Sequence, residues 1–303
     1  MSAPITPMTF GAQDTIQRDW PGRRIIAFIR EQPAGAAGLL VIASMLAAAF
    51  LAPWVAPYDP VAADYMAMLA PPSLAHPFGT DDFGRDIFSR IIYGAQTALT
   101  IGFLSSFVGC TIGAIVGVAS AYYGGWRDLI VQRVIDVMLS FPIIVLALVV
   151  VALLGHNRIA GIDLNLICAM IVPIVPRAAR VIRSAALSIR ELPYVDAARS
   201  AGYSDLRIIL RHMAPNVLAP YLILVTAYIA QAILLEASLS YLGLGVTDPT
   251  PAWGLMLSGS AASLYQQAPW MILFPGAAIS LAVFAFNLVG DALRDWLDPR
   301  FQN

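Results

Sequence analysis

The side chains that could perform acid–base or metal chemistry are few in this chain and lie far apart. His76, His156 and His212 do not form the HExxH spacing with which a helix binds zinc. All eighteen basic residues are arginine, so the lysine of the GxxxxGK[ST] phosphate-binding loop is missing. We therefore predict a chain without a catalytic or metal site, without a cofactor of its own and without ATP hydrolysis.

Glu236 is the most suggestive single charge, because it lies in an apolar stretch, where a carboxylate usually faces a bundle interior or water. At about 1.5 Å per residue, it stands roughly 29 Å along a helix that starts at Val217, near the outer surface. Two interpretations stay open. Glu236 is either part of an outer gate or a wetted interfacial group bonded by Ser238 or Ser240.

The same helix offers candidates for a path through which a solute could pass. Tyr228, Gln231 and Leu235 follow one another at three- and four-residue spacing, which places them on one helix face. With Glu236 they form our predicted solute path.

A charged segment from Glu191 to Pro215, ELPYVDAARSAGYSDLRIILRHMAP, separates two apolar stretches. Pro193 is expected to break the preceding helix and Gly202 to close a short new one in a left-handed conformation. Ser204 is a candidate N-cap for a second short helix, which Pro215 is expected to stop. Two short helices at an angle would form a protruding knob, whose candidate contact residues are Asp196, Ala197, Ala198, Gly202, Ser204, Asp205 and Pro215.

The composition requires a membrane to surround these segments. Hydrophobic residues make up 59% of the chain and charged residues 12%, and the mean hydropathy is +0.73. Segments that cross lipid must satisfy their own backbone hydrogen bonds, so the sequence predicts an all-α membrane protein with six crossing helices. The six apolar stretches are Ala36 to Val55, Ala98 to Tyr122, Val134 to Leu154, Leu164 to Ala179, Val217 to Leu239 and Pro269 to Leu288.

The arginines predict the orientation of these six helices. With the N-terminus inside, the cytoplasmic segments hold fifteen of the eighteen arginines, seven of them between Arg177 and Arg211. The outer segments keep only Arg85, Arg90 and Arg158. The positive-inside rule therefore predicts that both termini and the Glu191–Pro215 segment are cytoplasmic.

Three further patterns concern the packing of the helices. Gly109, Gly113 and Gly117 stand at four-residue spacing, which lets another helix approach closely. Pro142 is expected to kink the third stretch. An amphipathic run after Asp81 and Asp86 predicts a helix on the outer interface that leads into the second stretch, with local capping and ion pairing weighed against contact with another protein.

The charged segment resembles the EAA loop, the cytoplasmic element with which permeases of bacterial ABC importers dock on their ATP-hydrolysing subunits. Asp196-Ala197-Ala198, Gly202 and Pro215 carry that spacing. Four further stretches are similar to the C-type second permease of dipeptide and oligopeptide importers. They are HPFGTDDFGRDIFSRIIYGAQTAL from His76, AYYGGWRDLIVQRVIDVMLSFP from Ala121, EASLSYLGLGVTDPTPAWGLML from Glu236 and AFNLVGDALRDWLDPR from Ala285.

This resemblance implies a permease subunit of a binding-protein-dependent importer in a bacterial inner membrane, with peptides as the commonest cargo. It also implies the partners: a second, homologous permease, two subunits that bind ATP and Mg, and an extracytoplasmic solute-binding protein. Membrane lipid would surround the chain, and no nucleic acid is involved. The expected division is a cytoplasmic segment 1–35, a first helix with its outer loop and interfacial helix 36–96, and a core permease domain 97–303 that contains the loop at about 191–215.

Three alternatives remain at this level. The charged segment is also compatible with an amphipathic interfacial hairpin held by Arg199, Arg207 and Arg211. The whole chain could instead be a secondary transporter driven by an ion gradient, although its apolar stretches carry few central charges. A membrane-embedded hydrolase would need a serine and an aspartate paired across helices, and no spacing singles out such a pair.

Overall fold

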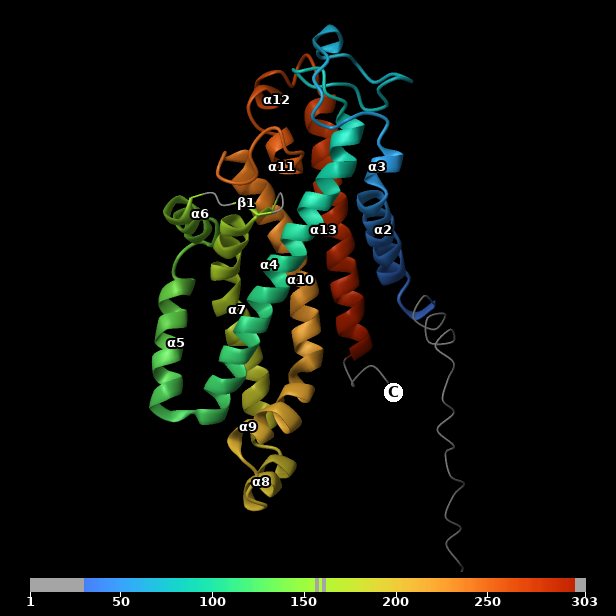
Figure 1. Ribbon diagram of the computed structural model, residues 1–303. Helices are drawn as coiled ribbons and strands as arrows, with labels where there is room; N and C mark the ends of the chain where they lie inside the picture. The colour runs from blue at the N-terminus through green and yellow to red at the C-terminus, as the bar shows by residue number, and fades with distance from the viewer. Residues whose placement is uncertain (1–29, 156–157, 160–161, 298–303) are drawn as a thin grey trace, which may run out of the picture.

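The computed structural model describes residues 30–155, 158–159 and 162–297, in which nearly all regular structure is helical (Figure 1). Long helices run side by side along one common direction. In these residues five helical segments are long and apolar enough to cross a membrane, and a bent helix pair brings the number to six if it counts as one crossing. The predicted all-α membrane bundle is confirmed.

The five continuous spans match five of the six predicted stretches and extend beyond most of them. Large apolar side chains such as Leu40, Phe50 and Leu273 stay exposed on their outer faces, as expected of helices that face lipid. The spans are α2 (Pro33–Phe50), α4 (Ile87–Tyr123), α7 (Leu164–Arg190), the helical run Asp205–Tyr241 that contains α10 (Leu218–Tyr241), and α13 (Trp270–Leu297).

The third predicted stretch, Val134 to Leu154, is not one continuous helix, so that prediction is wrong in this detail. It is divided between α5 (Gly125–Leu139) and α6 (Ile143–Leu154), whose axes differ by 92°. Pro142 stands at the break with extended backbone, ψ 138°. A proline has no backbone N–H and disfavours helical backbone in the residue before it, which explains why the helix ends here instead of bending gently.

The glycine spacing on α4 allows the close approach that the sequence predicted. A Cβ atom on Gly113 would lie 2.6 Å from the Cβ atom of Ala178 and 2.8 Å from the backbone oxygen of Val175 on α7. On Gly117, it would lie 2.5 Å from the backbone oxygen of Ala179. The two helices therefore pack backbone to backbone, and α10 and α13 complete the core around them.

Short elements form the two ends of the bundle. At one end lie α3 (Ala52–Val55), the 3₁₀ turn η1 (Tyr65–Ala67), α11 (Trp253–Met256) and α12 (Ser260–Ser263) (Figure 1). The two-residue strands β1 (Arg158–Ile159) and β2 (Ile162–Asp163) form an antiparallel pair before α7. At the opposite end, α8 (Pro193–Ser200) and α9 (Asp205–Ile208) protrude beyond the other helices.

The predicted interfacial helix is wrong as a separate element. The amphipathic run forms the first turns of α4, and Ile87 and Ile92 are buried against the protein. A continuous helix that crosses the bilayer does not also lie flat on its surface. The predicted boundary between 96 and 97 falls inside α4, and most of the predicted segment 1–35 lies outside the described residues, as does Arg300.

Candidate functional site

The first helix of the Glu191–Pro215 segment forms as its sequence predicts. The chain leaves α7 at Arg190, and Leu192 adopts extended backbone before Pro193 opens α8. Proline suits this first helical position, where its missing N–H would have no partner in the helix. Asp196 lies in the first turn and Arg199 in the last, each at the end of the helix dipole that favours its charge.

Gly202 ends α8 in the left-handed conformation that the sequence predicted, with φ at +77°. The amide of Tyr203 donates to the oxygen of Ala198 at 3.1 Å, and the amide of Gly202 donates to the oxygen of Arg199 at 2.9 Å. This pair of hydrogen bonds is a Schellman motif, which satisfies the last carbonyl groups of the helix.

The second half of the segment differs from the prediction. Ser204 stands at the N-cap of α9, yet its side chain makes no capping hydrogen bond. Pro215 does not stop a short helix: α9 continues through the π-helical turn η2 (Ile209–Met213) and the 3₁₀ turn η3 (Ala214–Val217) into α10. A π turn holds one extra residue and re-routes the backbone bonds, which lets the chain pass the proline without breaking the helical path.

Two faces distinguish α8. Val195 and Ala198 are buried beneath the helix, in a cluster with Ile208 and Met213. All the other predicted contact residues are exposed: Asp196, Ala197, Gly202, Ser204, Asp205 and Pro215. Ala198, predicted as a contact residue, therefore anchors the helix to the bundle instead. What remains is a protrusion that the Schellman motif closes at Gly202, with one buried and one exposed face.

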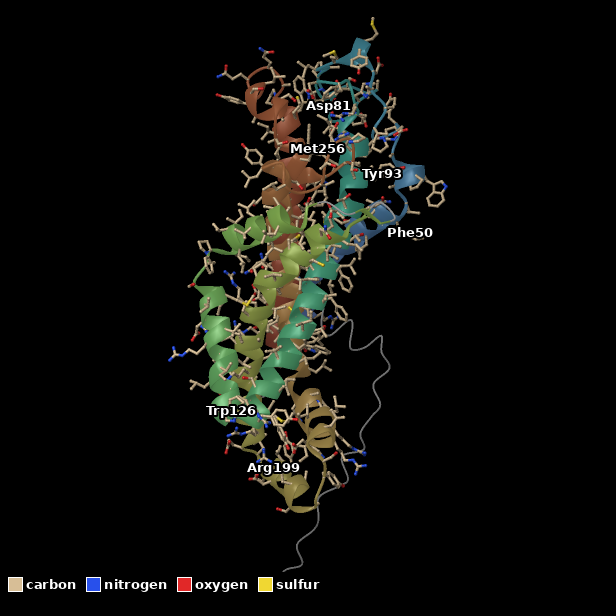
Figure 2. All side chains as sticks on the ribbon, turned by 60° about the vertical axis from the view of Figure 1, so that its left-hand side comes forward. Phe50, Asp81, Tyr93, Trp126, Arg199 and Met256 are labelled. Atoms are coloured by element: carbon tan, nitrogen blue, oxygen red, sulfur yellow. The ribbon has the colours of Figure 1, made fainter. Side chains whose placement is uncertain are left out.

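The last turns of α4 contact α5, α7, α8 and α9 at this end of the bundle, and we call these contacts the α4 clamp. The Tyr122 hydroxyl donates to Asp205 Oδ1 at 2.7 Å, and Arg199 lies over the Tyr122 ring with Cζ 5.3 Å from the centroid. Asp128 of α5 accepts two bonds from Arg183 of α7 and one from Ser120. Figure 2 shows Arg199 at this end of the molecule and Asp81 and Met256 at the opposite end.

At that opposite end, the charges that precede α4 form a buried network. Arg85 Nε donates to Asp81 Oδ2 at 2.7 Å, and Arg85 Nη1 donates to Asp248 Oδ1 at 2.9 Å. Burial lowers the pKa of Arg85, but the bonds and charges of Asp81 and Asp248 outweigh it and raise that pKa above its ordinary value. Asp86 accepts from the Ser89 amide at 2.8 Å and so caps α4. The predicted local capping and ion pairing are confirmed.

A cavity of about 370 Å³ lies beside this network, between the start of α4 and the segment that holds α11 and α12. Arg85, Asp82 and Asp248 line one side, and Met256 and Met271 line the other. Its polar groups are largely bonded to one another. We call the charged network together with this cavity the outer cap, after the predicted orientation of the helices.

The four residues of the predicted solute path do not share one open face. Tyr228 and Leu235 are buried in the bundle, whereas Gln231 is exposed. Glu236 is 1% exposed and accepts a hydrogen bond from the Ser240 hydroxyl at 2.6 Å, so the wetted interfacial interpretation is wrong for this chain. The prediction that Ser240 bonds Glu236 is confirmed, while the Ser238 hydroxyl donates to the oxygen of Leu234.

Sequence reasoning missed Arg177, which it counted as cytoplasmic. In the structure Arg177 lies inside α7, thirteen residues after Leu164 and thirteen before Arg190. It lines a cavity of about 320 Å³ together with Gln231, Leu234, Leu235 and Ser238 of α10, two of which, Gln231 and Leu235, belong to the predicted solute path. The signal was present, because Arg177 falls within the fourth predicted apolar stretch, where a charge points to function.

Comparison with known proteins agrees with this architecture. Residues 109–303 match the family described as binding-protein-dependent transport system inner membrane component, and residues 21–72 match the N-terminal transmembrane domain of oligopeptide transport permease C. The chain belongs to the first of these families. It is therefore a multi-pass permease component of a transport system rather than an enzyme, and the predicted family and general function are confirmed.

Several relatives cover nearly the whole chain. A putative peptide transport system permease protein of Brucella suis is 45% identical over 266 residues, 88% of this chain and 87% of the relative. A dipeptide transport system permease protein of Alkalihalophilus pseudofirmus is 40% identical over 93% of this chain and 91% of its own. A glutathione transport system permease protein of Escherichia coli is 43% identical over 91% of this chain and 89% of its own.

Proposed function

We propose that this chain is one of two membrane-spanning permease subunits of an ATP-driven importer of peptides in a bacterial inner membrane. The observation that carries the proposal is the protrusion of α8, which starts at Pro193 and is closed at Gly202, is buried through Val195 and Ala198 and is exposed through Asp196 and Ala197. Such a knob suits a socket on another protein, here the ATP-binding subunits, which would supply ATP and Mg. The names of the relatives, which refer to peptides, dipeptides and glutathione, favour a peptide cargo.

In this proposal the α4 clamp transmits the movement. Closure of the ATP-binding subunits displaces α8, and the bond from Tyr122 to Asp205 together with the Arg199 contact carries this displacement to α4. A second, homologous permease faces this chain, and an extracytoplasmic solute-binding protein delivers the solute at the outer cap. Both termini are cytoplasmic, in agreement with the described ends of α2 and α13, which lie toward the side of α8 (Figure 1).

The test is reconstitution with and without partners. The purified chain alone is expected to hydrolyse no ATP, and peptide uptake into proteoliposomes is expected only with the second permease, the ATP-binding subunits and the solute-binding protein. Uptake is measured with a radiolabelled dipeptide. Uptake by the lone chain that depends on a proton or sodium gradient would contradict the proposal and identify a secondary carrier.

A further inference from the structure

The cavity around Arg177 combines groups that no other part of the proposed mechanism uses. Its polar lining residues are Arg177 on α7 and Gln231 and Ser238 on α10, and Ile144, Leu234 and Leu235 are among its apolar ones. A second cavity of about 530 Å³ shares Ile144, Leu234 and Ser238 with it and extends to Tyr241 and Ser280. The two cavities therefore follow one face of α10 for about ten residues.

Arg177 differs from the other arginines near it on α7. Arg180 pairs with Asp136 of α5, and Arg183 pairs with Asp128 of α5 at 2.5 Å. Within the part of the chain that the structure describes, Arg177 has no acidic partner and donates no hydrogen bond, although it is half-buried. A charge inside a span is expensive unless it faces a cavity and meets an opposite charge. The described residues supply no such group to Arg177, which leaves its charge available to a negative group from elsewhere.

The neighbours of Arg177 indicate what kind of group fits. A guanidinium binds carboxylates through parallel N–H donors, and an amide adds a further donor. Gln231 is exposed toward the cavity and, in the described residues, its side chain makes no hydrogen bond. The apolar side chains of Ile144 and Leu234 suit the uncharged part of a small organic molecule.

We propose that Arg177 and Gln231 bind the carboxylate of the transported solute, for which a peptide with a free C-terminus is the matching class. This inference rests on the function proposed above and narrows its cargo. The unpaired guanidinium would repel a bare divalent cation. A peptide whose C-terminus is an amide would lack the negative charge that pairs with Arg177. Arg177 and Gln231 are thus specificity-determining residues of the passage. Of the predicted solute path on α10, Gln231 and Leu235 line this cavity, whereas Tyr228 is buried in the bundle.

The experiment probes this cavity directly, in the assembled complex of both permeases and the ATP-binding subunits. Cys168 is exposed, so it is replaced by serine, while Cys110 is buried. A Ser238→Cys substitution then places one reactive thiol in the cavity, and its labelling by a maleimide is followed on this chain. Alanyl-alanine is expected to protect the thiol, and alanyl-alanine amide is expected not to protect it.

Three variants sharpen the comparison. Arg177→Gln is expected to raise the concentration of alanyl-alanine needed for protection about tenfold or more, because a charged hydrogen bond is lost. Arg177→Lys, which keeps the charge, is expected to lose less. Arg180→Gln is the matched control, since its partner Asp136 is on this chain, and is expected to change nothing.

Equal protection by the dipeptide and its amide in the complex with Arg177 intact would overturn the inference, and this comparison needs no variant at Arg177. Assembly of Arg177→Lys but not of Arg177→Gln would also overturn it, because the charge would then pair with the second permease. Uptake of radiolabelled alanyl-alanine by the same complex, with its solute-binding protein, tests the proposed function separately. A complex that takes up the dipeptide but shows no selective protection contradicts only the carboxylate site.

Discussion

Single residues carry the coupling that we propose between α8 and the bundle, and Gly202 is the clearest of them. Its φ of +77° is unfavourable for a residue with a side chain, while a Cβ atom would meet no atom within 4 Å. We expect Gly202→Val to cost about 1–2 kcal/mol of local strain without a clash, because the left-handed conformation disfavours a β-branched residue. The complex should assemble, but ATPase activity stimulated by the binding protein and peptide should fall severalfold.

The matched control for this substitution is Gly202→Asn, because asparagine tolerates the left-handed conformation. It should retain most of the stimulation. Co-purification of all subunits is measured in parallel. Full stimulation in an assembled Gly202→Val complex would show that the segment is the interfacial hairpin considered from the sequence.

Tyr122→Phe tests the α4 clamp at the scale of one hydroxyl group. The substitution removes the 2.7 Å bond to Asp205 and leaves the ring beneath Arg199 in place. Asp205 is exposed, so water replaces part of the bond and the loss should be about 1 kcal/mol. We expect faster amide hydrogen exchange in α8 and α9, measured by mass spectrometry, and weaker stimulation of the ATPase.

Tyr123→Phe is the neighbouring control, since Tyr123 is 48% exposed and contacts Arg127 through its ring. It should leave exchange in α8 and α9 unchanged. If amide hydrogen exchange in α8 and α9 is the same in both variants, the hydroxyl of Tyr122 does not stabilise the protrusion.

Whole elements set the stability of the bundle, and the close backbone contact of α4 with α7 is a place to test it. A side chain on Gly113 would meet Ala178 Cβ at 2.6 Å, Val175 O at 2.8 Å and Ala179 N at 2.9 Å. Two of these atoms are backbone and cannot rotate away. We expect Gly113→Val to destabilise the fold by about 3 kcal/mol or more, measured as lower yield and a lower Tm in detergent.

Gly276→Ala on α13 is the control, because a Cβ atom there would meet nothing within 4 Å. Its yield and Tm should match those of the parent. A Gly113→Val variant as stable as the parent would mean that the two helices separate more easily than their backbone contact indicates.

Elements also show what the sequence could and could not predict. Hydropathy predicted six spans, five of which are continuous helices in the structure, and Pro193 and Gly202 predicted the ends of α8. Each of these signals is local. The sequence could not show that the helix ends at Pro142 but continues past Pro215, since both are prolines in helical surroundings. The helix continues past Pro215 because of the π turn at Ile209–Met213, which no local sequence pattern predicts.

Side-chain environments were the least predictable part. Helical spacing placed Tyr228, Gln231 and Leu235 on one face, but burial depends on which neighbouring helices cover that face. The structure buries Tyr228 in the bundle and leaves Gln231 exposed, and it places Gln231 and the largely buried Leu235 beside Arg177 at the cavity. Burial of this kind depends on tertiary packing. The sequence periodicity could therefore identify the helix but not which of its residues face the cavity.

At the scale of the whole molecule, the topology gives a direct prediction. Asp196 on α8 and Met66 near η1 are both exposed and lie at opposite ends of the bundle. In a Cys168→Ser background, Asp196→Cys should react with a membrane-impermeant maleimide only after the cells are opened. Met66→Cys should react in intact cells. The reverse pattern would invert the proposed orientation of every helix.

The unbroken length of α4 has a mechanical consequence. Its 37 residues form one helix from the charged network at Asp86 to the clamp at Tyr122, a length of roughly 55 Å. A stiff rod of that length turns each degree of tilt about one end into roughly 1 Å of travel at the other. Under the proposed coupling, a tilt of a few degrees imposed through α8 would reach the outer cap as a displacement of several ångströms, without any relay of side-chain rearrangements along the way.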